Sequence, residues 1–399
     1  MKYYFDEIID RHGTNSIKYD KMPVFFGRSD LQPLWVADMD FATPDFILND
    51  LKKRLEHPIL GYTLRKDSFY NSYINWAAKR YRWQVDKTWL DFSPGVVGAL
   101  GISILALTRE HDKIIVQPPV YHPFFDIIKG NNRQLVENPL IKQKNGRYRM
   151  DFDHLTSVID DQTKMIIIAN PHNPVGRVWQ ADELQKLGEI AVKNNLIIVS
   201  DDIHADFVYT PHQYTPLAGL SKAIAQQTIT ITSPSKTFNI AGLSTSIVII
   251  PNEKYRLAYQ RKLHDMHLFL GNIFGNIAFE AAYNNGEAWL EALLEYLQNN
   301  IRFVTDYLKQ HIPNIQPVQP EGTFLMWLDF SNTGLTHEQI KDKLINEAKI
   351  ALNDGLSFGK NGEKHFRMNI ASPRKNLEMA LKKLEIFQQK KVYLKKNNK

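Results

Sequence analysis

Cysteine is missing from this chain of 399 residues. Its absence excludes a disulfide framework, a thiolate metal site and a catalytic cysteine, and we expect no bound metal. Long apolar runs are missing too, because the longest one, Val96 to Leu107, is too short to cross a bilayer. The first residues are acidic and have no apolar core, so they do not predict a signal peptide. We therefore expect a soluble cytoplasmic protein with no membrane partner.

A strong charge of one sign is also absent, since the formal net charge is only +6 at pH 7. Part of this excess comes from lysines between residues 390 and 399, a composition typical of a solvated tail. No stretch interleaves basic and aromatic residues, so we expect no nucleic-acid partner. Hydrophobic residues make up 43% and charged residues 23%, as in ordinary globular proteins, and the length allows two domains.

The sequence pattern changes twice along the chain. Residues 1–47 mix charge, glycine and proline, which predicts an arm with little regular structure that joins the smaller domain. Residues 48–285 are predicted to form the large domain, and residues 286–399 a smaller α+β domain at the C-terminus. The helices and strands expected in this last part cover residues 288–311, 323–330, 336–347, 365–370 and 376–390.

The large domain is predicted to be an α/β structure. Apolar runs of strand length lie at 113–117, 164–169, 196–200 and 228–232, and helical patterns such as 181–194 separate them. Such alternation favours a mostly parallel sheet with helices on both faces. Ligands of these sheets bind at the carboxyl ends of the strands.

Polar residues follow four of these strands directly. Tyr121 follows the first strand, Asn173 the second, Asp201 and His204 the third, and the loop with Lys236 the fourth. Each group alone has a simpler explanation as a turn, a helix cap or part of the core. Four such groups at four strand ends indicate a common site.

The loop with Lys236 is rich in hydroxyl groups and lies between two β-type runs. A lysine at the edge of a sheet can form a Schiff base with a carbonyl compound if its surroundings lower its pKa. Neighbouring hydroxyls can bind a phosphate, and pyridoxal 5′-phosphate (PLP) needs both features. The alternative is a solvated lysine in a surface loop.

Two segments nearer the N-terminus add to this pattern. A glycine-bearing turn opens into a helix at Val96 and Val97, where free backbone N–H groups can bind an anion. Asp38 and Asp40 lie in an apolar run, where acids are costly to bury unless paired, so they either face solvent or line a polar site. Thr43 is expected to cap the helix that follows it.

Longer motifs resemble a known family. The segments NPHNPVG (170–176), SDDIH (200–204), SPSKTFNIAGL (233–243) and FRMNIASP (366–373) resemble the fold-type I PLP enzymes, the aspartate aminotransferase superfamily. Within it, RHGTNSIKYD (11–20), WVADMDF (35–41), SPGVVGAL (93–100) and PPVYHPFF (118–125) resemble the MalY/PatB-type cystathionine β-lyases and cysteine–sulfur lyases. The similarity covers essentially the whole chain.

The resemblance implies roles around the ring of PLP. Lys236 would carry the cofactor as a Schiff base, and Asp201 would pair with the protonated ring nitrogen. Asn173 would bond the 3′-oxygen with His204 close by, and Tyr121 would stack on the ring face.

It also implies how the phosphate and the substrate are held. The phosphate would be bound by the N–H groups of Val96 and Val97, by the hydroxyls of Ser233 and Ser235, and by Tyr62 of the neighbouring subunit. The protein would therefore be a homodimer with shared sites. Arg367 would bind the α-carboxylate of an amino-acid substrate, and Asp40 and Tyr121 would also lie at the substrate.

Two positions depart from the family pattern. Many relatives carry an arginine after the AGL of the lysine motif, where this chain has Ser244 and Thr245, so hydroxyls or another residue must hold the phosphate. Many also have glutamate after the ring aspartate, where this chain has Asp202.

The resemblance predicts a β-lyase that cleaves L-cystathionine or L-cysteine to a thiol, pyruvate and ammonia. An aminotransferase is the first alternative, because both reactions begin by removing the Cα proton with the same residues. A regulatory protein that binds PLP and acts through protein contact is the second alternative.

Overall fold

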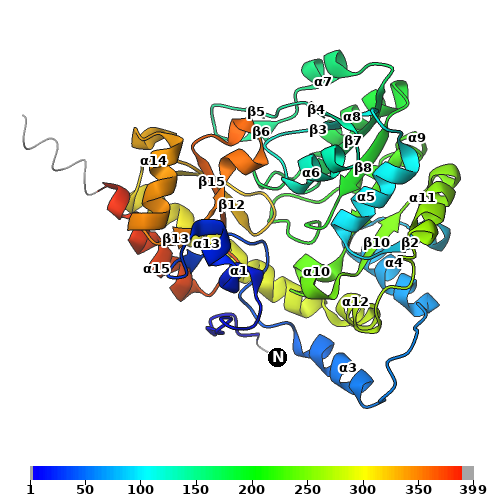
Figure 1. Ribbon diagram of the computed structural model, residues 1–399, viewed down its shortest axis with the longest axis horizontal. Coiled ribbons are helices and arrows are strands. Elements are labelled where there is room, and N and C mark those ends of the chain that lie inside the picture. The colour runs from blue at the N-terminus through cyan, green and yellow to red at the C-terminus, as the bar shows by residue number, and fades with distance from the viewer. Residues whose placement is uncertain (1–2, 389–399) are drawn as a thin grey trace, which may run out of the picture.

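The larger of two main sheets has seven strands in the order β2-β10-β9-β8-β7-β3-β4 in the computed structural model, which describes residues 3–388 (Figure 1). Its strands are β2 (Leu90–Ser93), β3 (Lys113–Val116), β4 (Gln134–Glu137), β7 (Thr163–Ala169), β8 (Ile197–Asp201), β9 (Thr228–Thr232) and β10 (Ser246–Ile249). Strands β4, β3, β7, β8 and β9 run parallel to one another, whereas β10 is antiparallel to both β9 and β2. The predicted mostly parallel α/β sheet is thus confirmed.

The apolar runs in these strands are buried on both faces of the sheet. Ile114 and Ile167 pack in one cluster with α5 (Val96–Leu107) and α11 (Glu253–Asp265), while Ile115 and Ile166 pack in another with α8 (Ala181–Lys193). Because successive side chains of a strand point to opposite faces, runs without polar residues suit a sheet covered by helices on both sides.

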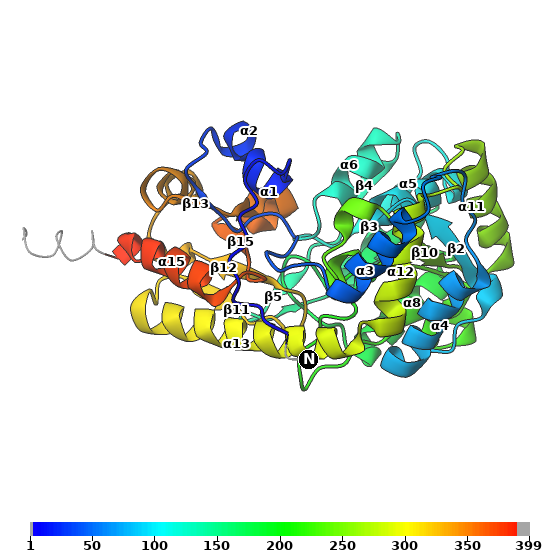
Figure 2. The ribbon, with the colours of Figure 1, turned by 90° about the horizontal axis from the view of Figure 1, so that it is seen from below.

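The smaller sheet is antiparallel and has the order β11-β12-β15-β14. Its strands are β11 (Gln316–Val318), β12 (Leu325–Asp329), β14 (Asn353–Asp354) and β15 (His365–Asn369). Figure 2 shows α13 (Glu287–His311) running beneath this sheet beside α15 (Arg374–Leu384). A single buried cluster joins side chains of α13, β12 and β15 to helices of the larger part, so the two sheets share a core.

The remaining elements are short or lie at the periphery. The helices are α1 (Ile17–Asp20), α2 (Met22–Phe26), α3 (Asp45–Leu55), α4 (Asp67–Tyr81), α6 (Pro123–Gly130), α7 (Phe152–Val158), α9 (Lys222–Ala225), α10 (Pro234–Thr237), α12 (Ile273–Asn285) and α14 (His337–Asp342). The strands are β1 (Gln32–Pro33), β5 (Ile141–Lys142), β6 (Tyr148–Arg149) and β13 (Ile350–Ala351). Strand β1 of the N-terminal arm pairs in parallel with β13, which attaches the arm to the part that contains the smaller sheet. The domain boundaries near residues 47 and 285 stay predictions.

Three expectations about helices differ from the structure. Thr43 is not a helix cap, because α3 begins after Pro44 and the Thr43 hydroxyl instead donates to the carbonyl oxygen of Asn239. The helix expected over 336–347 is α14 followed by a π-helical turn, Lys343–Glu347. The helix expected over 376–390 is α15, Arg374–Leu384, with residues 386–388 helical again after one turn residue, and residues 389–399, including the predicted lysine tail, lie outside the described residues.

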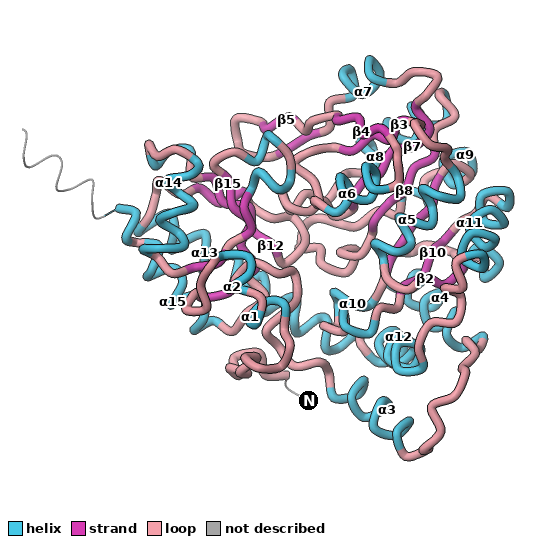
Figure 3. Tube along the Cα trace, in the orientation of Figure 1, coloured by secondary structure: helices cyan, strands magenta, loops and turns pink. Residues whose placement is uncertain are grey.

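The loops that follow the parallel strands gather between the two sheets. Figure 3 shows the strands in two separate groups with loop segments between them. Between residues 3 and 388, no helix has the length and apolar character needed to span a membrane. The space between the sheets is where the strand-end residues meet.

Candidate active site

A cavity lies at the carboxyl ends of the central strands. The residues that line it come from four strand ends, from the start of α5 and from the N-terminal arm: Ala37, Val96, Val97, Tyr121, Ala169, Asn173, Asp201, Ile203, His204 and Lys236. The structure therefore brings together the groups that the sequence places at separate strand ends.

Asp201 is the last residue of β8 and is buried, with 5% of its surface exposed. Its carboxylate accepts one hydrogen bond, from the N–H of Ile203 at 3.2 Å, and forms no ion pair with any residue between 3 and 388. Burial raises the pKa of this carboxyl to about 7. A buried carboxylate without a cation is costly, so the site suits a ligand that brings a positive charge to Asp201.

Lys236 lies in α10, the short helix that follows β9. Its Nζ atom donates to the carbonyl oxygen of Ala37 at 2.6 Å. Burial lowers the pKa of the amine to about 8, although the nearby carboxylates of Asp38 and Asp201 oppose this shift. A lysine with this pKa has a larger neutral fraction near pH 7 than an ordinary lysine, and the neutral amine is needed both for attack on a carbonyl and for proton abstraction.

Three further polar residues, His204, Asn173 and Tyr121, line the cavity. His204 is buried, its Nδ1 atom has no partner among residues 3–388, and burial lowers the pKa of its imidazole well below the usual value. The ring is therefore neutral at physiological pH. Asn173 uses its Oδ1 atom to accept from Arg367 at 3.0 Å. Tyr121 lines the same cavity, and burial raises the pKa of its hydroxyl, which keeps it neutral.

Arg367 is a buried cation in the middle of β15. Besides Asn173, it donates through Nη2 to the carbonyl oxygen of Trp35 at 3.0 Å and to the Asn353 side chain at 2.6 Å. Its guanidinium also lies over the ring of Phe358. Burial lowers the pKa of the guanidinium to about 10, so it stays charged at neutral pH. No carboxylate within residues 3–388 pairs with it, and its Nε atom has no partner, which suits an incoming anion.

The start of α5 also lines the cavity, through Val96 and Val97. Gly95 precedes this helix with φ of 100°, a conformation that favours glycine, and the first N–H groups of Val96 and Val97 face no earlier turn. Such a helix start binds anions. The hydroxyl of Ser233 already donates to the carbonyl oxygen of Thr245 at 2.7 Å, so its own contact with a phosphate stays a prediction, as does that of Ser235.

The two departures from the family pattern can also be placed. Ser244 is exposed, and the Thr245 hydroxyl donates to the carbonyl oxygen of Leu243, so which group holds the phosphate in place of the arginine stays a prediction. Asp202 is buried and directed to Ser200 and Tyr214, and burial raises the pKa of its carboxyl to about 7.

Five predicted site residues do not line the cavity: Arg367, Ser233 and Ser235, described above, and Tyr62 and Asp40. Tyr62 is 97% exposed on the segment between α3 and α4 and does not reach the site of its own chain. Asp40 is buried in an ion-pair cluster, where Lys18 binds one carboxylate oxygen at 2.8 Å and Arg11 binds the other at 2.9 Å. With both oxygens occupied, its predicted contact with substrate stays a prediction.

Sequence reasoning missed the cations that pair with Asp38 and Asp40. Arg11 also bonds Asp38 at 2.6 Å, and Lys18 is completely buried beside Asp40. The available signal was the pair of cations in the RHGTNSIKYD segment, since acids in an apolar stretch require nearby cations if they are buried.

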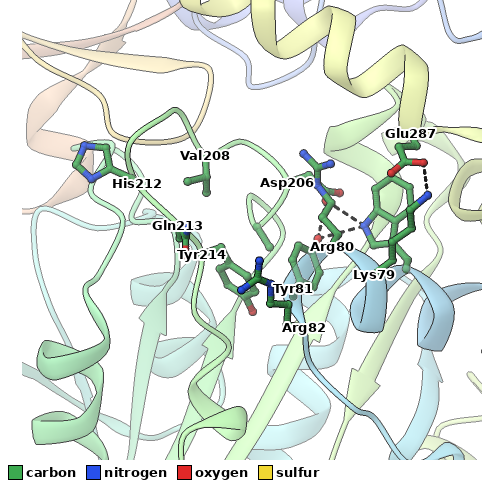
Figure 4. Close-up of a pocket in the computed structure, with 12 residues that line it drawn as sticks. Lys79, Arg80, Tyr81, Arg82, Asp206, Val208, His212, Gln213, Tyr214 and Glu287 are labelled. Carbon is green, nitrogen blue, oxygen red and sulfur yellow. Dashed lines mark hydrogen bonds and ion pairs between the residues drawn. The ribbon is translucent and has the colours of Figure 1, made fainter.

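A second pocket, shown in Figure 4, lies near Lys79, Arg80 and Tyr214 and contains neither Lys236 nor Asp201. Its buried carboxylate, Asp206, accepts from Tyr81 and, on the other side, from the Thr237 hydroxyl at 2.7 Å. No sequence motif singled out Asp206. Because Thr237 follows Lys236 in the chain, this contact helps to hold the loop that contains Lys236.

The cavity fits PLP on three counts. It offers a neutral lysine amine for the aldehyde, an unpaired buried carboxylate for the protonated ring nitrogen, and a helix start for the phosphate. The unpaired guanidinium of Arg367 remains for a substrate carboxylate.

Comparison with known proteins gives consistent results. The family model described as aminotransferase class I and II matches residues 34–384. The chain is 38% identical to cystathionine beta-lyase PatB of Bacillus subtilis strain 168 over 382 residues, which is 96% of this chain and 98% of the relative.

Two solved structures are similar over nearly their full length. Cystalysin from Treponema denticola, which contains PLP, has a TM-score of 0.94 and 32% identity, with coverage of 98% of this chain and 100% of that one. A PLP-bound structure from Clostridium difficile 630 that carries the name aminotransferase has a TM-score of 0.95 and 45% identity, with coverage of 96% and 99%.

Proposed function

The chain belongs to the aminotransferase class I and II family, and we propose that within this family it is a carbon–sulfur β-lyase. Its cofactor is PLP, which the similar structures contain. Enzymes of this family act on amino acids. The proposed reaction converts L-cystathionine or an L-cysteine-type substrate and water to a thiol, pyruvate and ammonia.

The proposal assigns the cofactor to the cavity beside Lys236. When bound, PLP supplies an aldehyde that condenses with amines and a protonated ring that accepts electron density from the substrate. Asp201 would keep the ring nitrogen protonated, because a buried carboxylate that forms no ion pair gains from that charge. Tyr121 would cover one ring face, and the N–H groups of Val96 and Val97 would bind the phosphate.

Arg367 and Lys236 would act on the substrate itself. A planar guanidinium can bind the α-carboxylate through two parallel hydrogen bonds, which fixes the orientation of the Cα–H bond. The Lys236 amine, with its pKa near 8, would then take the Cα proton. After the proton is removed, sulfur at the β-carbon can leave as a thiolate, and a substrate without such a leaving group cannot follow this path.

The choice of a lyase is supported by one observation above all. The identity of 38% with a cystathionine beta-lyase extends over 96% of this chain, so the whole site region is included. An aminotransferase is the second candidate, supported by the structure from Clostridium difficile 630 that carries that name at 45% identity. A regulatory protein with incidental PLP is the third.

One assay distinguishes these candidates. The PLP-loaded enzyme is mixed with L-cystathionine without any keto acid, and pyruvate is followed by coupling to lactate dehydrogenase while free thiol is measured separately. We expect pyruvate and thiol in equal amounts, and none from the Lys236→Ala variant. Turnover only after a keto acid is added would favour the aminotransferase, and no turnover in either case the regulatory protein.

We further propose that the enzyme is a homodimer with shared sites. The segment between α3 and α4 exposes the large side chains of Ile59, Leu60, Tyr62 and Leu64, with Tyr62 at 97% and Leu64 at 72%. A contiguous run of exposed apolar residues favours burial against a partner, and a twofold dimer is the commonest solution. Tyr62 would then reach the cofactor phosphate of the second subunit.

A further inference from the structure

The segment of residues 35–41, here called the strap, lies across Lys236 and is held by its carbonyl oxygens. From the side of the smaller sheet, Asn369 donates to the carbonyls of Val36 at 2.7 Å and Asp38 at 2.6 Å. Arg367 donates to that of Trp35. These contacts attach the first half of the strap to β15.

The second half of the strap is held by Asn239, in the loop that contains Lys236, and by two further contacts. Arg11 donates to the carbonyl of Met39 at 3.2 Å, and the N–H of Asp40 donates to the carbonyl of Ala371 at 2.9 Å. The Asn239 amide donates through Nδ2 to the carbonyls of Met39 at 3.0 Å and Phe41 at 2.7 Å. Its Oδ1 atom accepts from the N–H of Met39 at 3.0 Å. The amide therefore bonds the strap as both donor and acceptor, in the manner of a backbone strand.

The backbone of Asn239 explains why asparagine suits this position. Its φ is 56°, in the left-handed region, which asparagine tolerates better than other residues with a side chain. Glycine would tolerate the same φ but has no amide, and aspartate would have the same shape but no donors.

Three N–H groups in the middle of the strap are free. The N–H groups of Val36, Ala37 and Asp38 have no acceptor within residues 3–388, whereas the carbonyl oxygens of the same residues are all bonded. Ala37 also lines the cofactor cavity. The protein thus holds the middle of the strap through its carbonyl oxygens, and these three N–H groups remain available to a ligand.

We propose that Asn239 is a positioning residue that fixes the strap over Lys236. The proposal rests on the proposed lyase function only for its kinetic test. We call the three hydrogen bonds between the Asn239 side chain and the strap the clamp. Because Asn239 and Lys236 belong to one loop, the clamp sets the position of Ala37. The carbonyl of Ala37 accepts a hydrogen bond from the Lys236 amine when that amine is not bonded to the cofactor. Substrate then meets a lysine, a guanidinium and strap donors in fixed relative positions.

Two variants of the PLP-loaded enzyme test the clamp. Asn239→Gly removes the amide but keeps the backbone conformation, and Asn239→Asp places a carboxylate against the carbonyls of Met39 and Phe41. We expect both to raise KM for L-cystathionine by about tenfold or more, the size of one or two lost hydrogen bonds, with Asp at least as harmful as Gly. A residue needed only for shape would show the opposite order, because aspartate is isosteric.

Hydrogen exchange provides a readout independent of turnover. The hydrogen-bonded strap amides, those of Met39 and Asp40, are expected to exchange about tenfold faster in both variants, on the basis of the same lost hydrogen bonds, while the rest of the chain is unchanged. Asn132→Gly is the matched control, since Asn132 has φ of 58° on an exposed turn outside the site. It should show the wild-type exchange and KM.

The outcomes separate the two proposals. If wild-type enzyme gives no pyruvate, the lyase function fails, but exchange of the strap still decides the role of Asn239. Wild-type exchange in the strap of Asn239→Gly and Asn239→Asp overturns the clamp, as does faster exchange throughout the chain. If Asn239→Asp does not fold, Asn239→Gly alone gives the same decision.

Discussion

Arg367 donates a hydrogen bond from Nη1 to the Oδ1 atom of Asn173 at 3.0 Å, although the two residues are 194 positions apart. The bond joins the central strand of the smaller sheet to the loop that follows β7 in the larger sheet. It places the proposed carboxylate anchor against a proposed cofactor contact. Any movement between the two sheets therefore alters the geometry of substrate and cofactor together.

Arg367→Lys should weaken substrate binding more than turnover. A single ammonium cannot form two parallel hydrogen bonds to a carboxylate and also bond Asn173, so we expect KM for L-cystathionine to rise about 10- to 100-fold. Steady-state kinetics measure this directly. Arg374→Lys is the control, because Arg374 bonds Asn300 outside the cavity. An unchanged KM in Arg367→Lys would assign the α-carboxylate to another group.

Asp201 and Asp202 are adjacent buried carboxyls with different expected roles. Asp201→Asn removes the partner of the ring nitrogen, so we expect kcat to fall by about 10²–10³-fold, the usual cost of losing a key electrostatic group. Asp202→Asn keeps a polar side chain toward Ser200 and Tyr214 and should retain most activity. If kcat falls further in Asp202→Asn than in Asp201→Asn, the partner of the ring nitrogen is Asp202 instead.

The stability of the PLP-free protein should depend on the charge of Asp202. Burial raises the pKa of this carboxyl from 3.8 to about 7, so the folded protein binds this proton more tightly than the unfolded chain. The stability gained from that proton is complete below pH 4 and is lost as the pH rises through 7. Asp202→Asn has no such loss, so its Tm relative to wild type should rise between pH 5 and pH 8.

The quantity to measure is the difference in Tm between Asp202→Asn and wild type. His172 and His122 have pKa values lowered by burial to about 4, and their effect on stability has the opposite sign between pH 4 and 6.5. Because both proteins contain these histidines, their contribution cancels in the comparison. A Tm difference that stays constant from pH 5 to pH 8 would contradict the prediction.

Tyr62 should act on the site of the other subunit. Tyr62→Ala and Lys236→Ala are each expected to be impaired, but a mixed dimer combines the intact Tyr62 of one chain with the intact Lys236 of the other. After unfolding and refolding an equal mixture, we expect about a quarter of the wild-type activity, since half of the dimers are mixed and each has one intact site. If the refolded mixture is no more active than the two variants measured separately, Tyr62 does not contribute to the site of the other subunit.

The sequence by itself determined the architecture and the centre of the site. Strand and helix patterns alternate with the periods that physical chemistry imposes, and the carboxyl ends of parallel strands must meet at one edge of the sheet. Lys236, Asp201 and Asn173 each follow a strand directly, so their convergence could be predicted from order alone. The resemblance to PLP enzymes then supplied their expected roles.

The tertiary structure alone decided which polar groups pair with one another. Asn239 bonds Met39 across 200 positions, Arg367 reaches Trp35 across 332, and Asp40 is occupied by Lys18 and Arg11 instead of facing the cofactor cavity. Hydrogen bonds require atoms within about 3 Å, and that precision depends on how two sheets and an arm pack, which no local pattern encodes. The same limit explains why Ser233 could be placed in the loop by sequence while the direction of its hydroxyl, toward Thr245, could not.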